Sequence, residues 1–174
     1  MELKGKKVLV MIEQDYNDYE FIYPYYRLLE AGANVEVVAP EAGKTYPSKG
    51  GTTATSTLAA KDSVPGDYTG VVIPGGFAPD FMRRHEAMVN LVREMFNQNK
   101  VVAAICHGGW MLASANIVKG KNVTSFFSIK SDLVNAGATW LDKEVVVDGN
   151  LITSRIPDDL PFFMRATLDS MSSK

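Results

Sequence analysis

The sequence is short of the residues that form disulfides and metal sites. It has one cysteine among 174 residues, so no disulfide can form within the chain, and a lone thiol fits a reducing, cytoplasmic location. Its two histidines, His85 and His107, have no ligand-type residues at metal-binding spacing beside them. We therefore expect no metal site.

Long apolar runs, basic tracts and cofactor motifs are also missing. The first strand-like run, residues 7–12, is too short for a signal-peptide core or a membrane span. The formal net charge is −2, and no basic stretch is interleaved with aromatics, which argues against nucleic-acid binding. Gly75 and Gly76 lack the spacing of a dinucleotide fingerprint, and there is no Gly-Lys-Ser/Thr phosphate loop. We expect no cofactor, no nucleic-acid partner and no membrane partner.

What the chain does have is an alternation of strand and helix patterns. Its length and 46% hydrophobic content suit one core, so we expect a single domain over residues 1–174. The alternation predicts a three-layer α/β/α sandwich with a mostly parallel sheet. Residues 41–69 are predicted to form a flap or small hairpin. The predicted strands are 8–12, 34–39, 52–56, 70–73, 101–105, 123–125, 144–147 and 151–153, and the predicted helices are 19–31, 86–98, 128–136 and 160–171.

The rest of the chain is organised around residues 101–112. Five small or β-branched apolar residues predict a buried strand, and a helical pattern follows at once, so Cys106 lies on a sharp strand-to-helix corner. A cysteine there is exposed at the carboxyl edge of the sheet, and a helix N-terminus is expected to lower its pKa below the free value of roughly 8.5. Gly108 and Gly109 allow close backbone packing. The alternative is a small buried hydrophobic residue, but the strand-Cys-His-Gly-helix context favours catalysis.

Three other features are considered as candidates for the site. Glu20 is expected near a helix start, whether the helix begins at Pro24 or kinks there. Gly75 and Gly76 follow a buried strand, so their N–H groups either point into the crevice or simply form a tight turn. His85 is interpreted as a solvated helix-start residue without chemistry.

Six segments in order resemble the ThiJ/PfpI superfamily, and within it the PfpI-like branch. The similarity runs from about residue 7 to residue 170. It implies a flavodoxin-like fold, a nucleophile elbow similar to that of class I glutamine amidotransferases, and assembly as a homodimer or hexamer. The segments are EFIYP at 20–24, VIPGGFAPD at 72–80, AICHG at 104–108, DLVNAG at 132–137, EVVVDG at 144–149 and TSRIPD at 153–158.

The resemblance also implies roles for single residues. Cys106 would be the nucleophile, His107 its neighbouring base, and Glu20 the carboxyl that hydrogen-bonds the thiol. We expect burial to raise the pKa of Glu20, so that it donates a hydrogen bond to the thiolate. The N–H groups of Gly76 and His107 would form the oxyanion hole. Asp80 takes the place of the acid that reaches the histidine of a neighbouring subunit in PfpI-like peptidases.

Two residues depart from the family pattern. Gly109 replaces the usual proline, which would loosen the elbow, and Asp80 is one methylene shorter than the usual glutamate, which weakens the case for a third triad member.

The resemblance implies a cysteine-dependent, stress-protective hydrolase or lyase. Its substrates would be reactive carbonyls such as small aldehydes, or glycation adducts, as in glyoxalase III and deglycase activities. A PfpI-type intracellular cysteine peptidase acting on peptides is the alternative. A third interpretation, of another class, is a non-enzymatic redox sensor or chaperone-like stress protein, because a reactive thiol beside a carboxylic acid can also be oxidised to a sulfinate.

Overall fold

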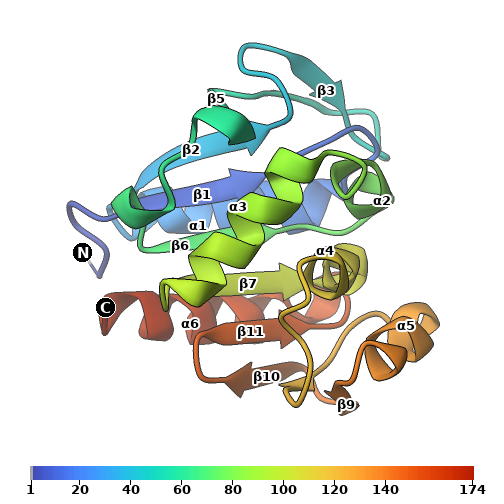
Figure 1. The fold of residues 1–174 in the computed structure, drawn as a ribbon. Coiled ribbons are helices and arrows are strands. Elements are labelled where there is room, and N and C mark those ends of the chain that lie inside the picture. The colour runs from blue at the N-terminus through green and yellow to red at the C-terminus, as the bar shows by residue number, and fades with distance from the viewer. Residues whose placement is uncertain (1) are drawn as a thin grey trace.

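The structure is a computed structural model that describes residues 2–174. Its centre is a seven-stranded sheet in the order β10-β11-β7-β6-β1-β2-β5 (Figure 1). All neighbouring strands are parallel except β10 and β11, which form a hairpin. The predicted mostly parallel sheet is therefore confirmed. The strands are β1 (Lys7–Met11), β2 (Asn34–Ala39), β5 (Leu58–Ala59), β6 (Gly70–Ile73), β7 (Val101–Ile105), β10 (Val145–Asp148) and β11 (Leu151–Ser154).

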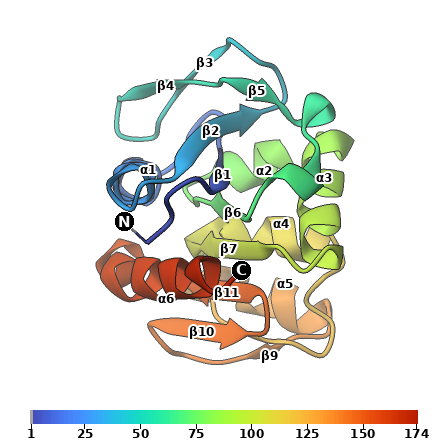
Figure 2. The ribbon, with the colours of Figure 1, turned by 90° about the vertical axis from the view of Figure 1, so that its left-hand side faces the viewer.

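Helices cover both faces of this sheet, which confirms the three-layer sandwich (Figure 2). On one face lie α1 (Asp18–Glu30) and α6 (Leu160–Ser172). On the other lie α2 (Ala78–Met82), α3 (Glu86–Asn97) and α4 (Gly109–Ser114), and α5 (Lys130–Asn135) packs against α4. Every residue of β7 is buried, as expected for a central strand covered on both faces. Within residues 2–174, no helix is both long and apolar enough to cross a membrane.

The predicted flap contains a hairpin that is fastened to the first turn of α1. The hairpin pairs β3 (Thr45–Pro47) with β4 (Thr53–Thr55) in antiparallel fashion. Asp18 accepts hydrogen bonds of 2.6 Å from the hydroxyls of Ser48 and Thr52, and one of 2.8 Å from the N–H of Gly50. These bonds hold the hairpin tip beside the carboxyl ends of the strands.

Three elements differ from the sequence expectation in extent. Helix α1 begins at Asp18 and continues through Pro24, because the side chain of Asn17 caps it by accepting from the N–H groups of Tyr19 and Glu20. The helix expected over 128–136 is shorter and follows a 3₁₀ turn at Phe127–Ile129. The strand expected at 123–125 is β8 (Asn122–Val123), which pairs with β9 (Thr139–Trp140) outside the main sheet.

Candidate active site

Cys106 lies on the predicted corner directly after β7. Its φ of +60° is a left-handed conformation that non-glycine residues rarely adopt, and such backbone is typical of a nucleophile at a strand-to-helix turn. The residue is buried at 7% exposure. A Cβ atom at Gly108 would lie 2.7 Å from the carbonyl oxygen of Ile73, so only glycine allows the close packing beside this corner.

Glu20 reaches the cysteine from the first turn of α1. Its carboxyl is fully buried and lies against the Cys106 thiol. Oε2 accepts a 2.7 Å hydrogen bond from the N–H of Gly75, and Oε1 is buried without a hydrogen-bond partner among the described residues. A Cβ atom at Gly75 would lie 2.6 Å from Oε2 of Glu20 and 2.8 Å from Cβ of Cys106. Glycine at this position therefore lets the acid and the thiol meet.

The two groups have strongly shifted pKa values. Burial raises the pKa of Glu20 to about 7, against smaller lowering by the Gly75 N–H, the Cys106 thiol and the Lys49 charge. This confirms the predicted direction. Burial, followed by the charge of Glu20, raises the pKa of the Cys106 thiol to about 12.

The expected lowering of the thiol pKa is therefore wrong. The residues after Cys106 form a 3₁₀ turn, and α4 begins only at Gly109 and is six residues long, so the stabilisation expected from a helix N-terminus is small. Burial and the neighbouring carboxylate outweigh it. The hydrogen bond between the two side chains lowers the pKa of Glu20 and raises that of Cys106, so in this contact Glu20 is the acceptor and not the predicted donor.

Both ring nitrogens of His107 have a polar contact. Nδ1 lies 3.3 Å from Sγ of Cys106, and Nε2 lies 3.2 Å from Oγ of Ser128. The rings of Trp110 and Phe126 each have their centroids 5.0 Å from the imidazole. Burial is the main cause that lowers the pKa of His107, which favours the neutral imidazole. The sequence analysis did not find Ser128, which there was only the start of a predicted helix.

The predicted oxyanion-hole groups meet at the sulfur. The backbone N–H groups of Gly76 and His107 both lie beside Cys106, and each lowers the pKa of its thiol. Gly76 has a φ of +73°, and a Cβ atom there would lie 2.4 Å from the carbonyl oxygen of Asp15. Only glycine therefore fits at this turn, and Gly76 lines the cavity at Cys106.

Asp80 lies apart from these groups on α2. It forms ion pairs with Arg83, at 3.1 Å, and with Arg84. Among the hydrogen bonds and ion pairs of residues 2–174, none joins Asp80 to His107. A role across a subunit interface stays a prediction.

Gly109, the other departure from the family pattern, has an ordinary helical φ of −56°. A Cβ atom there would lie 3.1 Å from Cδ1 of Ile129 and 3.2 Å from Cδ1 of Leu133. Glycine at this position therefore leaves room for the tightly packed side chains of Ile129 and Leu133. Its φ is also close to the value that a proline would impose.

The cysteine opens into a cavity of about 480 Å³, a volume suited to a small organic ligand. Sequence reasoning missed Lys49, which the flap brings to this cavity, and the aromatic residues Phe77 and Phe126. No cluster of three or more metal-ligating side chains was found among residues 2–174. The lining residues are Asp15, Asn17, Lys49, Gly76, Phe77, Cys106, His107, Phe126, Ile156 and Pro157.

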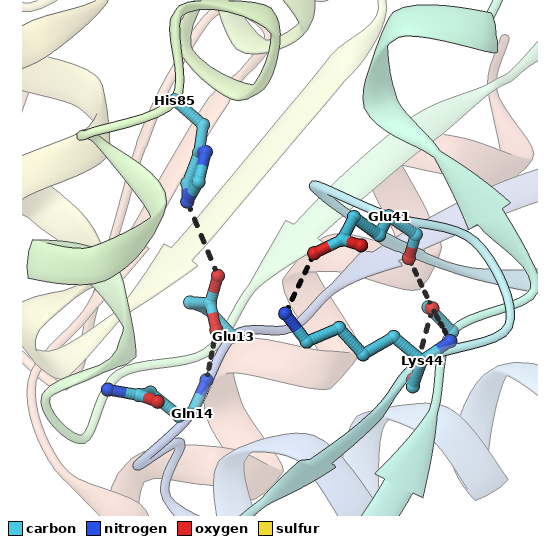
Figure 3. A network of polar contacts seen from close by, with 6 residues as sticks. Glu13, Gln14, Glu41, Lys44 and His85 are labelled. Atoms are coloured by element: carbon cyan, nitrogen blue, oxygen red, sulfur yellow. Dashed lines mark hydrogen bonds and ion pairs between the residues drawn. The ribbon is translucent and has the colours of Figure 1, made fainter.

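A second polar network involves His85 (Figure 3). Nε2 of this histidine lies 3.5 Å from Oε2 of Glu13, and Lys44 forms a 2.8 Å ion pair with Glu41 nearby. His85 is half-exposed and precedes α3, as expected for a helix-start residue. None of these residues lines the cavity at Cys106.

The sandwich and its corner cysteine define a class of α/β proteins that carry a sharp strand-to-helix elbow at the carboxyl edge of the sheet. The sequence profile of the DJ-1/PfpI family matches residues 6–170, and the chain belongs to this family. The resemblance found in the sequence motifs is thereby confirmed.

Several relatives are similar over most of their length. Deglycase PfpI from Pyrococcus furiosus is 42% identical over 159 residues, which cover 91% of this chain and 95% of that protein. Putative cysteine protease YraA from Bacillus subtilis is 38% identical over 165 residues, which cover 95% of this chain and 98% of that protein. The crystal structure of Drosophila melanogaster DJ-1beta has a TM-score of 0.89 at 30% identity, with 97% of this chain and 91% of that chain covered. Family members are thus named for enzymatic activities, both deglycase and cysteine protease.

Proposed function

We propose that this protein is a cysteine-dependent enzyme that acts on reactive carbonyls, such as 2-oxo aldehydes, or on their early glycation adducts. The observation that carries the proposal is the buried pair of Glu20 and Cys106. A carboxyl with a pKa of about 7 beside a thiol that keeps its proton is suited to take that proton during attack. The name of the Pyrococcus furiosus relative, a deglycase, agrees with carbonyl chemistry.

The first step forms a carbon–sulfur bond. Glu20 accepts the thiol proton while Sγ of Cys106 attacks the aldehyde carbon of the substrate. We assign the N–H groups of Gly76 and His107, which lower the pKa of the thiol, to stabilising the alkoxide that develops on the aldehyde oxygen. Protonation of this oxygen gives a hemithioacetal.

The second step is an internal redox reaction. A base removes the proton from the former aldehyde carbon, and a proton returns to the adjacent ketone carbon, so the first carbon is oxidised to a thioester while the second is reduced to an alcohol. Glu20, whose Oε1 has no other partner in the described chain, is the group we assign to this proton transfer. Water then hydrolyses the thioester and releases a 2-hydroxy acid and the free thiol, so no external oxidant or reductant is needed.

Peptide hydrolysis is the second candidate. It is favoured by the contact between Sγ of Cys106 and Nδ1 of His107 at 3.3 Å, and by the name of the relative from Bacillus subtilis. In this reaction His107 would donate a proton to the leaving amine. Ser128 is the residue that orients the ring within one chain, which is a weaker orienting group than the acid of a triad.

A substrate panel separates the two reactions and the non-enzymatic interpretation. Purified protein and its Cys106→Ser variant are assayed with methylglyoxal, glyoxal and a fluorogenic peptide. We expect hydroxy-acid formation from the aldehydes by the wild type and at least a hundredfold loss in the variant. Peptide cleavage without aldehyde turnover would favour the peptidase, and no turnover of any substrate would favour a redox sensor.

A further inference from the structure

The cavity at Cys106 has an apolar wall that the proposed chemistry does not use. Phe77 comes from the turn before α2, Phe126 from the turn before α5, and Ile156 and Pro157 from the segment after β11. Phe77 is 48% exposed although it lines the cavity. A large aromatic side chain left this exposed beside a reactive thiol gains free energy when a ligand covers it.

Phe77, in this wall, packs against Trp110, which is itself fixed by polar contacts. The ring of Phe77 is edge-on to that of Trp110, with centroids 6.1 Å apart at an interplanar angle of 87°. Nε1 of Trp110 donates a 2.6 Å hydrogen bond to Asp132, and the guanidinium of Arg83 lies 4.9 Å from the centre of the indole ring. The N–H of Phe77 donates a 2.9 Å hydrogen bond to the carbonyl of Asp15. Phe77 is therefore preorganised, so little conformational entropy of this side chain is lost when a ligand binds.

We propose that Phe77 and Phe126 determine substrate specificity by selecting 2-oxo aldehydes whose ketone carries an aryl group. This inference rests on the proposed function and names the substrate class of the same site. Phenylglyoxal represents this class, and its product is mandelate, formed with water as the only other reactant.

The physical reason is the difference between a phenyl and a methyl substituent. A phenyl group can make offset or edge-to-face contacts with Phe77 and Phe126, whereas a methyl group leaves most of the exposed ring of Phe77 in water. Lys49 is the positively charged residue that lines the cavity, and it comes from the flap and not from the aromatic wall. Arg83, which lies near Trp110, forms an ion pair with Asp80. Phe77, Phe126, Ile156 and Pro157 are all uncharged, so this wall of the cavity favours an uncharged ring.

The experiment compares kcat/KM for phenylglyoxal and methylglyoxal, measured by chromatography of mandelate and lactate at early times. The variants are Phe77→Ala, Phe77→Tyr as the conservative replacement, and Phe162→Ala as the matched control. Phe162 is 45% exposed, close to the 48% of Phe77, but it lies on α6 and does not line the cavity. Thermal melting of each variant verifies that it is folded.

We expect the wild type to prefer phenylglyoxal by about tenfold or more, and Phe77→Ala to lose about tenfold of that ratio, the range for a lost apolar contact in a specificity pocket. Phe77→Tyr and Phe162→Ala should keep the wild-type ratio. A wild-type preference for methylglyoxal, or equal losses for both aldehydes in Phe77→Ala, would overturn the aryl selectivity while the carbonyl chemistry stands. No turnover of either aldehyde would overturn both proposals.

Discussion

Two carboxyl groups that the family resemblance singles out have opposite environments in this molecule. Glu20 is fully buried in the first turn of α1, and burial raises its pKa to about 7. Asp80 lies on α2 between two arginines, and its hydrogen bond to Arg84 is the main cause that lowers its pKa. At neutral pH the first group can accept and release a proton, whereas the second stays ionised. The same chemical group is thus suited to proton transfer in one place and to an ion pair in the other.

The largest expected difference is in turnover. Glu20→Gln preserves the shape of the side chain but removes the base, so kcat for methylglyoxal should fall by about a hundredfold or more. Asp80→Asn should change it by less than about threefold, because a surface ion pair contributes little. Steady-state kinetics of both variants under identical conditions makes the comparison. Full aldehyde turnover by Glu20→Gln would remove its assignment as the base.

The second comparison concerns how the free energy of unfolding changes with pH. A group whose pKa is raised on folding binds its proton more tightly in the folded state, so its stabilising contribution is lost as the pH rises from about 4.5 to about 7. For the Glu20 shift this amounts to about 3 kcal/mol in the free energy of unfolding. Urea unfolding at several pH values should show wild type losing stability relative to Glu20→Gln as the pH rises from about 4.5 to about 7, because glutamine does not titrate. Asp80→Asn should give no such slope between pH 5 and pH 8, since its lowered pKa acts below this window. A constant difference for Glu20→Gln would contradict the raised pKa.

The third comparison concerns the pH midpoint of Cys106 alkylation, where we expect a smaller effect that reports on the thiol alone. The rate of reaction with iodoacetamide should have its midpoint well above the free-thiol value of roughly 8.5. Glu20→Gln should move this midpoint down, because the carboxylate charge is the second cause of the raised thiol pKa. Asp80→Asn should leave it unchanged. A wild-type midpoint at or below the free value would show that the elbow stabilises the thiolate after all.

The smallest expected effect concerns assembly. Among the contacts of residues 2–174 none joins Asp80 to His107, so the predicted role of Asp80 requires the histidine of a second copy. We expect a homodimer or larger assembly by light scattering, and any peptidase activity should fall on dilution and in Asp80→Ala. A monomer, or an unchanged peptidase rate in Asp80→Ala, would leave a site complete within one chain.

Sequence reasoning succeeded where a local pattern determines structure. The apolar run before Cys106 predicted a fully buried strand, and every residue of β7 is buried. The Asp-Gly-Asn turn after residue 147 predicted the hairpin of β10 and β11. In each case neighbouring residues alone decide the geometry.

Sequence reasoning failed where distant segments of the chain form the environment of a site residue. The pKa of Cys106 depends on burial and on a carboxylate 86 positions earlier in the chain, and both effects exceed the short helix after it. Ser128 and Lys49 reach the site through tertiary packing of a turn and of the flap, and neither carries a motif. Phe77 could have been noticed as an apolar residue directly after the glycine pair, but only the structure shows that its ring lines the cavity.

The most direct test of the central claim, that Glu20 is the base for Cys106, is the pH dependence of kcat/KM for methylglyoxal. The wild-type value should rise with pH as Glu20 ionises and level off above about 7. In Glu20→Gln this rise in kcat/KM near pH 7 should disappear. The residual activity should instead follow ionisation of the thiol at much higher pH. An unchanged rise of kcat/KM near pH 7 in Glu20→Gln would show that Glu20 is not the base for Cys106.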